Sequence, residues 1–310
     1  MICWLDCPQL LLLSGKASAG RHRELVVLNS DDMDNVRVRH FPIPVAEATN
    51  VLTIPGREGV IIVGDGGSKI LELDFSTGII ATLYASTPGE AGFRAGAHGS
   101  VSEGHLYIWG AFHSATGAAV REGIVDIPLA GGPMVALTSS GEIVSQIPVS
   151  ALCGSLVAPD SCFFVGRSDS VSIMKLVGDE VVEIDSGDVF HGLWGSRHRV
   201  LFILEREDVD SPQVLLHDTL TNTTTPIASG DYSYPVLSGD GSTVVFAEYD
   251  YEHGLMTYYL AAEDDGFAMH ELLQNVPIGP LRLSLGGKFY AYLSVNGLTV
   301  GQVANVIAWC

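Results

Sequence analysis

Short apolar segments recur along the chain at regular intervals. Seven of them have the composition of a strand core, and their starts lie 50, 46, 57, 38, 43 and 45 residues apart; they are residues 10–13, 60–63, 106–109, 163–166, 201–204, 244–247 and 289–292. A period of about 40–45 residues built only from strand-like pieces is typical of a β-propeller, in which each repeat is one blade. We therefore expect an all-β fold, a seven-bladed β-propeller of four-stranded antiparallel blades, as a single domain over residues 1–310.

Residues 49–85 show one repeat most clearly. Four strand-like segments are separated by polar, glycine-rich turns, and the Ser-Thr-Gly turn at residues 76–78 is a hairpin signal because glycine accepts a positive φ. The same rhythm places the blades at 1–41, 49–85, 98–139, 151–185, 190–229, 233–274 and 279–310, with the first and last blades side by side. The second strand of each blade is packed on both faces, so its central residue should be buried: Leu12, Ile62, Ile108, Val165, Ile203, Phe246 and Tyr292.

Several turns also resemble those of a known repeat family. The Ser-Gly-Asp-Gly-Ser phrase at residues 238–242 precedes an apolar strand, and residues 158–161 and 285–288 are weaker copies of it. Residues 70–78 carry the phrase Leu-Glu-Leu-Asp followed by Thr-Gly. Together these phrases resemble the TolB-like (WD40-like) propeller repeats. The resemblance implies a fold and not an activity, because such propellers serve as scaffolds, peptidase gates, lyases and binding modules.

The charge of the chain restricts its partners. The formal net charge is −20, with 36 acidic and 16 basic residues. A surface this acidic repels phosphate backbones and anionic lipid, so we expect no nucleic-acid binding. No apolar run approaches the roughly 18 residues of a membrane span, and we expect no membrane insertion. A basic protein partner is allowed, and the simpler alternative is that the charge serves solubility.

The cysteines bear on the compartment. The chain has five, Cys3, Cys7, Cys153, Cys162 and Cys310, an odd and sparse set that argues against a disulfide framework. Free thiols in a reducing compartment, and hence a cytoplasmic location, are the expectation. A secreted protein is the alternative, because residues 10–19 superficially resemble a signal peptide, although no basic residue precedes the apolar run.

Loops that share one face of a propeller usually hold its ligand sites. Connections between second and third strands are expected at residues 14–23, 110–122, 205–212 and 248–254. They combine aromatic residues with both signs of charge, a mixture suited to a protein interface: Arg21, His22, Arg23, His113, Arg121, Tyr249, Tyr251, His253 and the acidic run 205–210.

The innermost strands supply the candidate ligand-binding residues. His98 and His191 occur in related phrases at the start of two blades, and Tyr234 and Arg282 lie on other inner strands. Converging histidines can bind a divalent metal or act as acid and base, but two histidines do not complete a metal shell. Hydrogen-bonded structural histidines are the competing interpretation. We therefore expect no metal, no cofactor and no catalytic residue.

These observations favour a non-catalytic scaffold that mediates protein–protein interaction through its loop-rich face. One alternative is an enzyme whose site lies at the mouth of the propeller's central channel, either a lyase or a lactonase-type hydrolase, with metal assistance as an option. Another is a propeller that binds a small ligand or carbohydrate, for which Trp194, Tyr232 and Tyr234 would be the aromatic platform. The sequence does not specify the oligomeric state.

Overall fold

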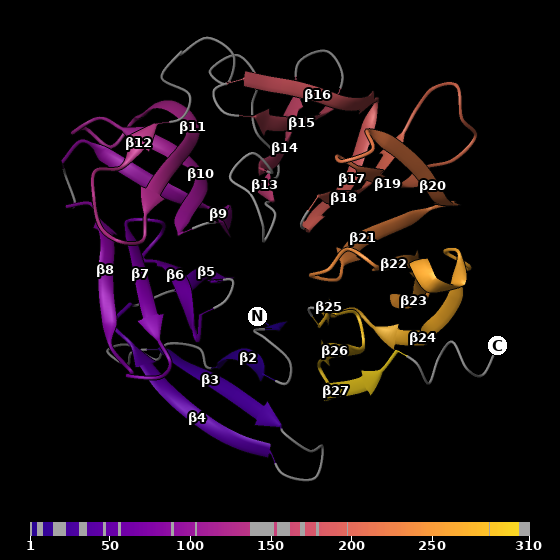
Figure 1. Cartoon of the computed structure of the whole chain (residues 1–310), viewed down its shortest axis with the longest axis horizontal. Coiled ribbons are helices and arrows are strands. Elements are labelled where there is room, and N and C mark those ends of the chain that lie inside the picture. The colour runs from indigo at the N-terminus through magenta and orange to yellow at the C-terminus, as the bar shows by residue number, and fades with distance from the viewer. Residues whose placement is uncertain are drawn as a thin grey trace.

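The described strands form antiparallel sheets that follow one another along the chain (Figure 1). The structure is a computed structural model, and it describes residues 2–4, 9–14, 23–30, 36–45, 48–54, 57–87, 90–102, 104–136, 152–153, 162–167, 171–177, 180–196, 198–284 and 286–303. There are seven sheets in these ranges, named A to G here in chain order, and in each the strands pair in sequence order.

The strand bounds agree closely with the predicted repeats. Sheet A comprises β1 (Ile2–Trp4), β2 (Gln9–Ser14), β3 (Arg23–Ser30) and β4 (Val36–Ile43). Sheet B comprises β5 (Ala48–Thr53), β6 (Gly59–Gly64), β7 (Lys69–Asp74) and β8 (Ile80–Ala85). Sheet C comprises β9 (Gly92–Ser102), β10 (His105–His113), β11 (Ala119–Pro128) and β12 (Val135–Ala136). Sheets D and E comprise β13 (Leu152–Cys153), β14 (Cys162–Arg167), β15 (Val171–Val177) and β16 (Glu180–Gly187); and β17 (Val189–Ser196), β18 (Arg199–Glu205), β19 (Gln213–Asp218) and β20 (Thr223–Ser229). Sheets F and G comprise β21 (Tyr232–Leu237), β22 (Thr243–Asp250), β23 (Leu255–Ala262) and β24 (His270–Pro277); and β25 (Leu281–Leu283), β26 (Phe289–Ser294) and β27 (Gly297–Gln302).

The sheets are arranged around a centre with their first strands innermost (Figure 1). Contacts between first strands join β5 to β9, β9 to β13, β13 to β17, β17 to β21 and β21 to β25. β1 also contacts β25, so the expectation that the first and last sheets meet is confirmed. This arrangement is a β-propeller, and it confirms the predicted fold class.

The prediction of seven four-stranded blades is not met as stated. Sheets B, C, E, F and G are described for most of their side chains, which gives five well-described blades, whereas few side chains of sheets A and D are described. Sheet G has three strands in the described part of the chain, which ends at residue 303. β12 and β13 are only two residues long, so pairing at the edge of sheet C and at the inner edge of sheet D is short.

The core lies between neighbouring sheets. Separate clusters of buried apolar side chains fill the interfaces between sheets A and B, B and C, D and E, E and F, and F and G. Five of the predicted core residues, Ile62, Ile108, Ile203, Phe246 and Tyr292, are at most 3% exposed, which confirms the register of their strands. The side chains of Leu12 and Val165 lie outside the described part of the chain.

Helix is nearly absent from the described residues. They contain one 3₁₀ turn, Glu263–Asp265, at the β23–β24 connection. None of the described helical structure is long and apolar enough to cross a bilayer.

Candidate functional site

Two neighbouring inner strands carry β-bulges at the same end of their sheets. In β17, Phe190 pairs with Leu204 and Gly192 with Ile203, so His191 is an extra residue. In β21, Ser233 pairs with Ala247 and Val236 with Val245, so Tyr234 and Pro235 lie opposite one partner residue. A bulge breaks the alternation of side chains and re-aims the extra residue. The two bulges therefore determine where His191 and Tyr234 point.

The two bulges pack against each other. A Cβ atom on Gly192 would lie 2.3 Å from Cδ of Pro235, so only glycine permits this approach of β17 to β21. Tyr234 has a φ of +54°, in the left-handed region that side chains other than glycine seldom adopt. Such strain persists where the surrounding structure fixes it, and it often accompanies function. Despite this constraint, Tyr234 remains 58% exposed.

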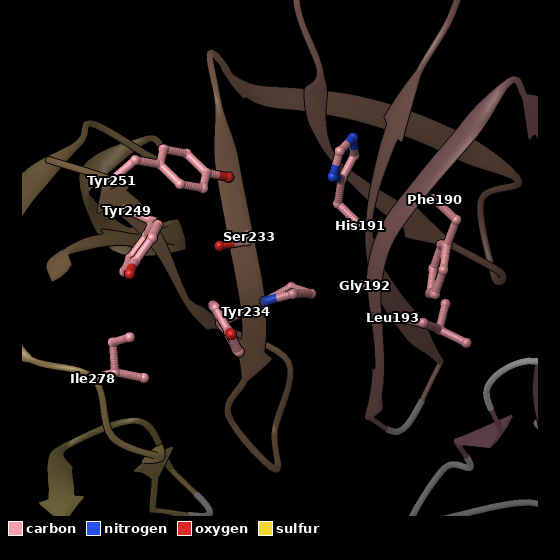
Figure 2. A pocket seen from close by; sticks show the side chains of 10 residues that line it. Phe190, His191, Gly192, Leu193, Ser233, Tyr234, Tyr249, Tyr251 and Ile278 are labelled. Carbon is pink, nitrogen blue, oxygen red and sulfur yellow. The ribbon is translucent and has the colours of Figure 1, made fainter. Parts of the chain in front are cut away.

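A pocket of about 730 Å³ opens at this end of sheets E and F (Figure 2). Its walls are the starts of β17 and β21, the end of β22 and the link that enters β25, and its lining residues are Phe190, His191, Gly192, Leu193, Ser233, Tyr234, Pro235, Tyr249, Tyr251 and Ile278. Figure 2 shows Tyr249 and Tyr251 on one side, Phe190 and His191 on the other, and Tyr234 between them. This is the face that carries the loop after β22, as expected for the loop-rich face.

Two tyrosines form a corner of the pocket. The ring centroids of Tyr249 and Tyr251 lie 4.5 Å apart with the ring planes at 86°, and Tyr251 is 76% exposed. The loop is ordered by Asp250, which accepts hydrogen bonds from the backbone N–H groups of Glu252 at 2.9 Å and His253 at 3.1 Å. Nδ1 of His253 lies 2.7 Å from the other carboxylate oxygen, and this hydrogen bond is the main reason that the pKa of Asp250 is lowered.

The opposite wall is bordered by carboxylates. Nε2 of His191 lies 3.4 Å from Oε2 of Glu205, the last residue of β18. The loop that follows is tied to the link between β16 and β17, because the backbone N–H of Glu207 donates to Asp188 at 2.7 Å. Glu207, Asp208 and Asp210 of this loop are exposed, so the predicted acidic run forms an acidic border beside the pocket.

The structure brings together two of the four predicted ligand-binding residues. His191 and Tyr234 line the same pocket. Arg282 is on the next inner strand, but its guanidinium lies 4.7 Å above the ring of Trp194 and donates to the carbonyl of Leu281 at 2.7 Å, and it does not line the pocket. His98 lies on β9, two sheets away from β17, and its side chain is outside the described part of the chain.

The proposed carbohydrate platform is not assembled as one surface. Tyr232 packs its ring against Phe246 at 4.8 Å and Tyr259 at 5.7 Å, and Trp194 is covered by Arg282. Only Tyr234 of that trio lines the pocket. Among the side chains that the structure describes, no three His, Cys, Asp or Glu residues converge as a metal site.

Sequence reasoning missed the apolar wall of the pocket, namely Phe190, Leu193, Pro235 and Ile278. The signals were the glycine after His191 and the proline after Tyr234, both of which indicate irregular strand backbone. Neither signal shows that the two irregularities touch, because that contact joins residues on different sheets.

Comparison with known proteins identifies the fold. No family model matches the chain, and no curated protein matches it. An oligogalacturonate lyase from Vibrio parahaemolyticus superposes with a TM-score of 0.69 at 9% identity, covering 97% of this chain and 88% of the lyase. The β-propeller domain of Myceliophteria thermophila Cps50 (Swd1) gives 0.61 at 10%, covering 97% and 96%. TolB from Acinetobacter baumannii gives 0.53 at 15%, covering 87% of this chain and only 64% of TolB. The resemblance to TolB-like propellers is thus confirmed for the fold, and these identities carry no activity across.

Proposed function

We propose that this chain is a non-catalytic β-propeller scaffold that binds a protein partner through the face on which the pocket opens. The observation that carries the proposal is a set of exposed apolar and aromatic side chains on that face. Tyr251, Tyr234 and Ile278 are 76%, 58% and 50% exposed, although each borders a pocket. Aromatic side chains next to charged residues are the usual composition of a protein-binding surface.

The charge supports a basic protein as partner and argues against nucleic acid. Sheets E and F, residues 189–277, contain fourteen acidic and three basic residues. Such a surface attracts a basic partner and repels a phosphate backbone. A cytoplasmic location and the absence of a cofactor are part of the same proposal, and so is a complete ring of seven four-stranded blades.

The experiment is site-specific photo-crosslinking in the native host. A photoreactive residue at position 251 should crosslink to a partner protein, whereas one at position 220 should not. Leu220 is a matched control because it is also 76% exposed and lies after β19, at the opposite end of sheet E. Equal crosslinking from both positions, or from neither, would contradict a partner-binding face.

A channel-mouth enzyme is the second candidate, favoured by one observation. The structural neighbours include an oligogalacturonate lyase, and the pocket of this chain opens beside the inner strands. Incubation of the purified protein with oligogalacturonate and manganese tests it, with formation of unsaturated product as the readout. Turnover that is lost on substitution of His191 by alanine would replace the scaffold proposal.

A further inference from the structure

We propose that the pocket between sheets E and F binds a lysine side chain of a basic partner segment, with the tyrosine rings as the recognition surface. This inference rests on the proposed function and specifies the chemistry of the partner. A pocket of about 730 Å³ is larger than one side chain, so neighbouring residues of the segment enter with the lysine.

The aromatic rings provide surfaces suited to a cation. A cation is attracted to the face of a tyrosine ring within about 6 Å of its centroid. Tyr249 and Tyr251 present two rings at nearly a right angle, and Tyr234 adds a third from the neighbouring inner strand (Figure 2). The bulge of β21 and the loop held by Asp250 fix the backbone that carries two of these rings before a ligand arrives, which reduces the entropy lost on binding.

The charged groups around the pocket favour a cation over an anion. Glu205 borders one wall, and Asp250 and Glu252 belong to the loop that carries the tyrosine corner. Arg206, which follows Glu205, is engaged elsewhere, because it pairs with Asp185 at 2.6 Å. His253 pairs with Asp250, and His191 lies beside Glu205, so both imidazoles have a carboxylate partner. The described surroundings thus place more carboxylates than cations at the opening.

Apolar walls select a long side chain rather than a bare ion. Phe190, Leu193 and Ile278 add hydrocarbon surface to the lining of the pocket. A lysine buries its methylene stem along such surface while the ammonium stays at a polar or aromatic site. A short polar side chain would leave this hydrocarbon surface uncovered.

The test uses the whole protein and a defined probe, a fluorescein-labelled peptide of alternating glycine and lysine, measured by fluorescence anisotropy. Matched peptides carry glutamine or Nε-trimethyllysine in place of lysine. We expect the dissociation constants of the lysine and trimethyllysine peptides to agree within about threefold, because a cation is attracted to a ring face by its charge and not by its N–H groups. The glutamine peptide should bind at least about tenfold more weakly. Equal binding of the lysine and glutamine peptides overturns the inference. So does a trimethyllysine peptide whose affinity is more than about tenfold lower than that of the lysine peptide.

Substitutions that leave the net charge unchanged distinguish binding in the pocket from general attraction of a basic peptide to an acidic protein. Tyr251→Ala and Tyr234→Ala should each weaken binding of the lysine peptide by about threefold to thirtyfold. Tyr251→Phe should retain binding because it keeps the aromatic ring. Leu220→Ala, at the other end of sheet E, should have no effect. Unchanged binding in both tyrosine-to-alanine variants overturns the inference. If position 251 still crosslinks a partner but the peptides do not discriminate, the scaffold function stands and only this inference fails.

Discussion

Single residues at the inner strands decide the shape of the site. Gly192 has no room for a side chain because Pro235 of the next sheet occupies that space. Tyr234 adopts a positive φ so that the chain can pass through the bulge, and its ring is left exposed in the pocket. The sequence singled out His191 and Tyr234 as inner-strand residues. The requirement for glycine at position 192 comes from its contact with Pro235 of the neighbouring sheet.

Gly192→Ala should destabilise the protein and deform the pocket. The new Cβ would lie 2.3 Å from Cδ of Pro235, closer than carbon atoms can approach, so β17 and β21 must separate. We expect a loss of about 1–3 kcal/mol in the free energy of unfolding, measured by urea denaturation. Gly286→Ala is the matched control, because its nearest neighbour is an Asp240 oxygen at 3.8 Å, and it should change stability by less than about 0.5 kcal/mol. Equal stability of the two variants would show that the sheets adjust without cost.

Among the side chains that the structure describes, arginines join neighbouring sheets at three places. Arg39 of sheet A donates to the carbonyl of Phe75 in sheet B at 3.0 Å. Arg206 of sheet E bonds to Asp185 and to the carbonyl of Ser186 in sheet D. Arg199 of sheet E donates twice to Glu263 and once to the carbonyl of Gly241, both in sheet F. These bonds add directional contacts to apolar interfaces that are themselves non-directional.

Arg199→Met should weaken the interface between sheets E and F in a pH-dependent way. The hydrogen bond from Arg199 lowers the pKa of Glu263. Burial alone would raise the pKa of Asp218, but the N–H donors of Leu220, Arg199 and Thr221, together with the nearby charge of His198, lower it. A depressed carboxyl pKa stabilises the fold above the unfolded pKa, and the contribution is lost as the pH falls through the folded value. The variant should lose about 1–2 kcal/mol near neutral pH, because the pair is partly exposed, and the difference from wild type should shrink between about pH 5 and pH 3.

Urea denaturation across that pH range measures the difference. Arg57→Met is the control, because Arg57 makes one exposed ion pair with Glu72 at 3.5 Å and should contribute less than about 0.5 kcal/mol. If the difference in the free energy of unfolding between Arg199→Met and wild type stays constant down to about pH 3, the pKa values of the two carboxylates do not depend on Arg199.

The second strands could be predicted from the sequence, and the bulges could not. Strand cores such as 60–63 and 201–204 are continuous apolar runs between polar turns, and every one of their side chains is buried. Their position therefore follows from composition alone. The bulges at His191 and Tyr234 depend on the register with the second strand and on the neighbouring sheet, and no local pattern encodes either.

Ile108→Ala in β10 should remove one of these core contacts. Ile108 is fully buried between sheets B and C, so the truncation leaves a cavity and should cost about 2–5 kcal/mol. Ile79→Ala removes the same atoms from a side chain that is 64% exposed and should cost less than about 1 kcal/mol. Thermal unfolding followed by circular dichroism compares them, and similar losses in the two variants would contradict the assigned register of sheet C.

At the scale of the whole molecule, stability depends on closing the ring. Each core cluster joins two neighbouring sheets, so the first and last sheets each have two partners only when they meet each other. The contact of β1 with β25 provides that closure (Figure 1). The repeat period predicted this meeting because the two terminal sheets of a propeller must be neighbours.

Deletion of residues 1–14 should open the ring at this contact. The variant lacks β1 and β2, so sheet G loses its contact with sheet A and keeps only sheet F as a neighbour, and sheet A loses half of its strands. Because repeat arrays are stabilised by interfaces between neighbours, sheet G should then unfold at a lower temperature than sheets B to F, which gives a broadened or split thermal transition in place of a single one. Limited proteolysis should cut first within the remainder of sheet A and within residues 281–302. Val295→Ser, at an 88% exposed turn of the same sheet, should leave both the transition and the cleavage pattern unchanged, since it alters no interface. A deletion variant that unfolds in one transition at the wild-type temperature would mean that sheet G is held by sheet F alone and that closure adds nothing to stability.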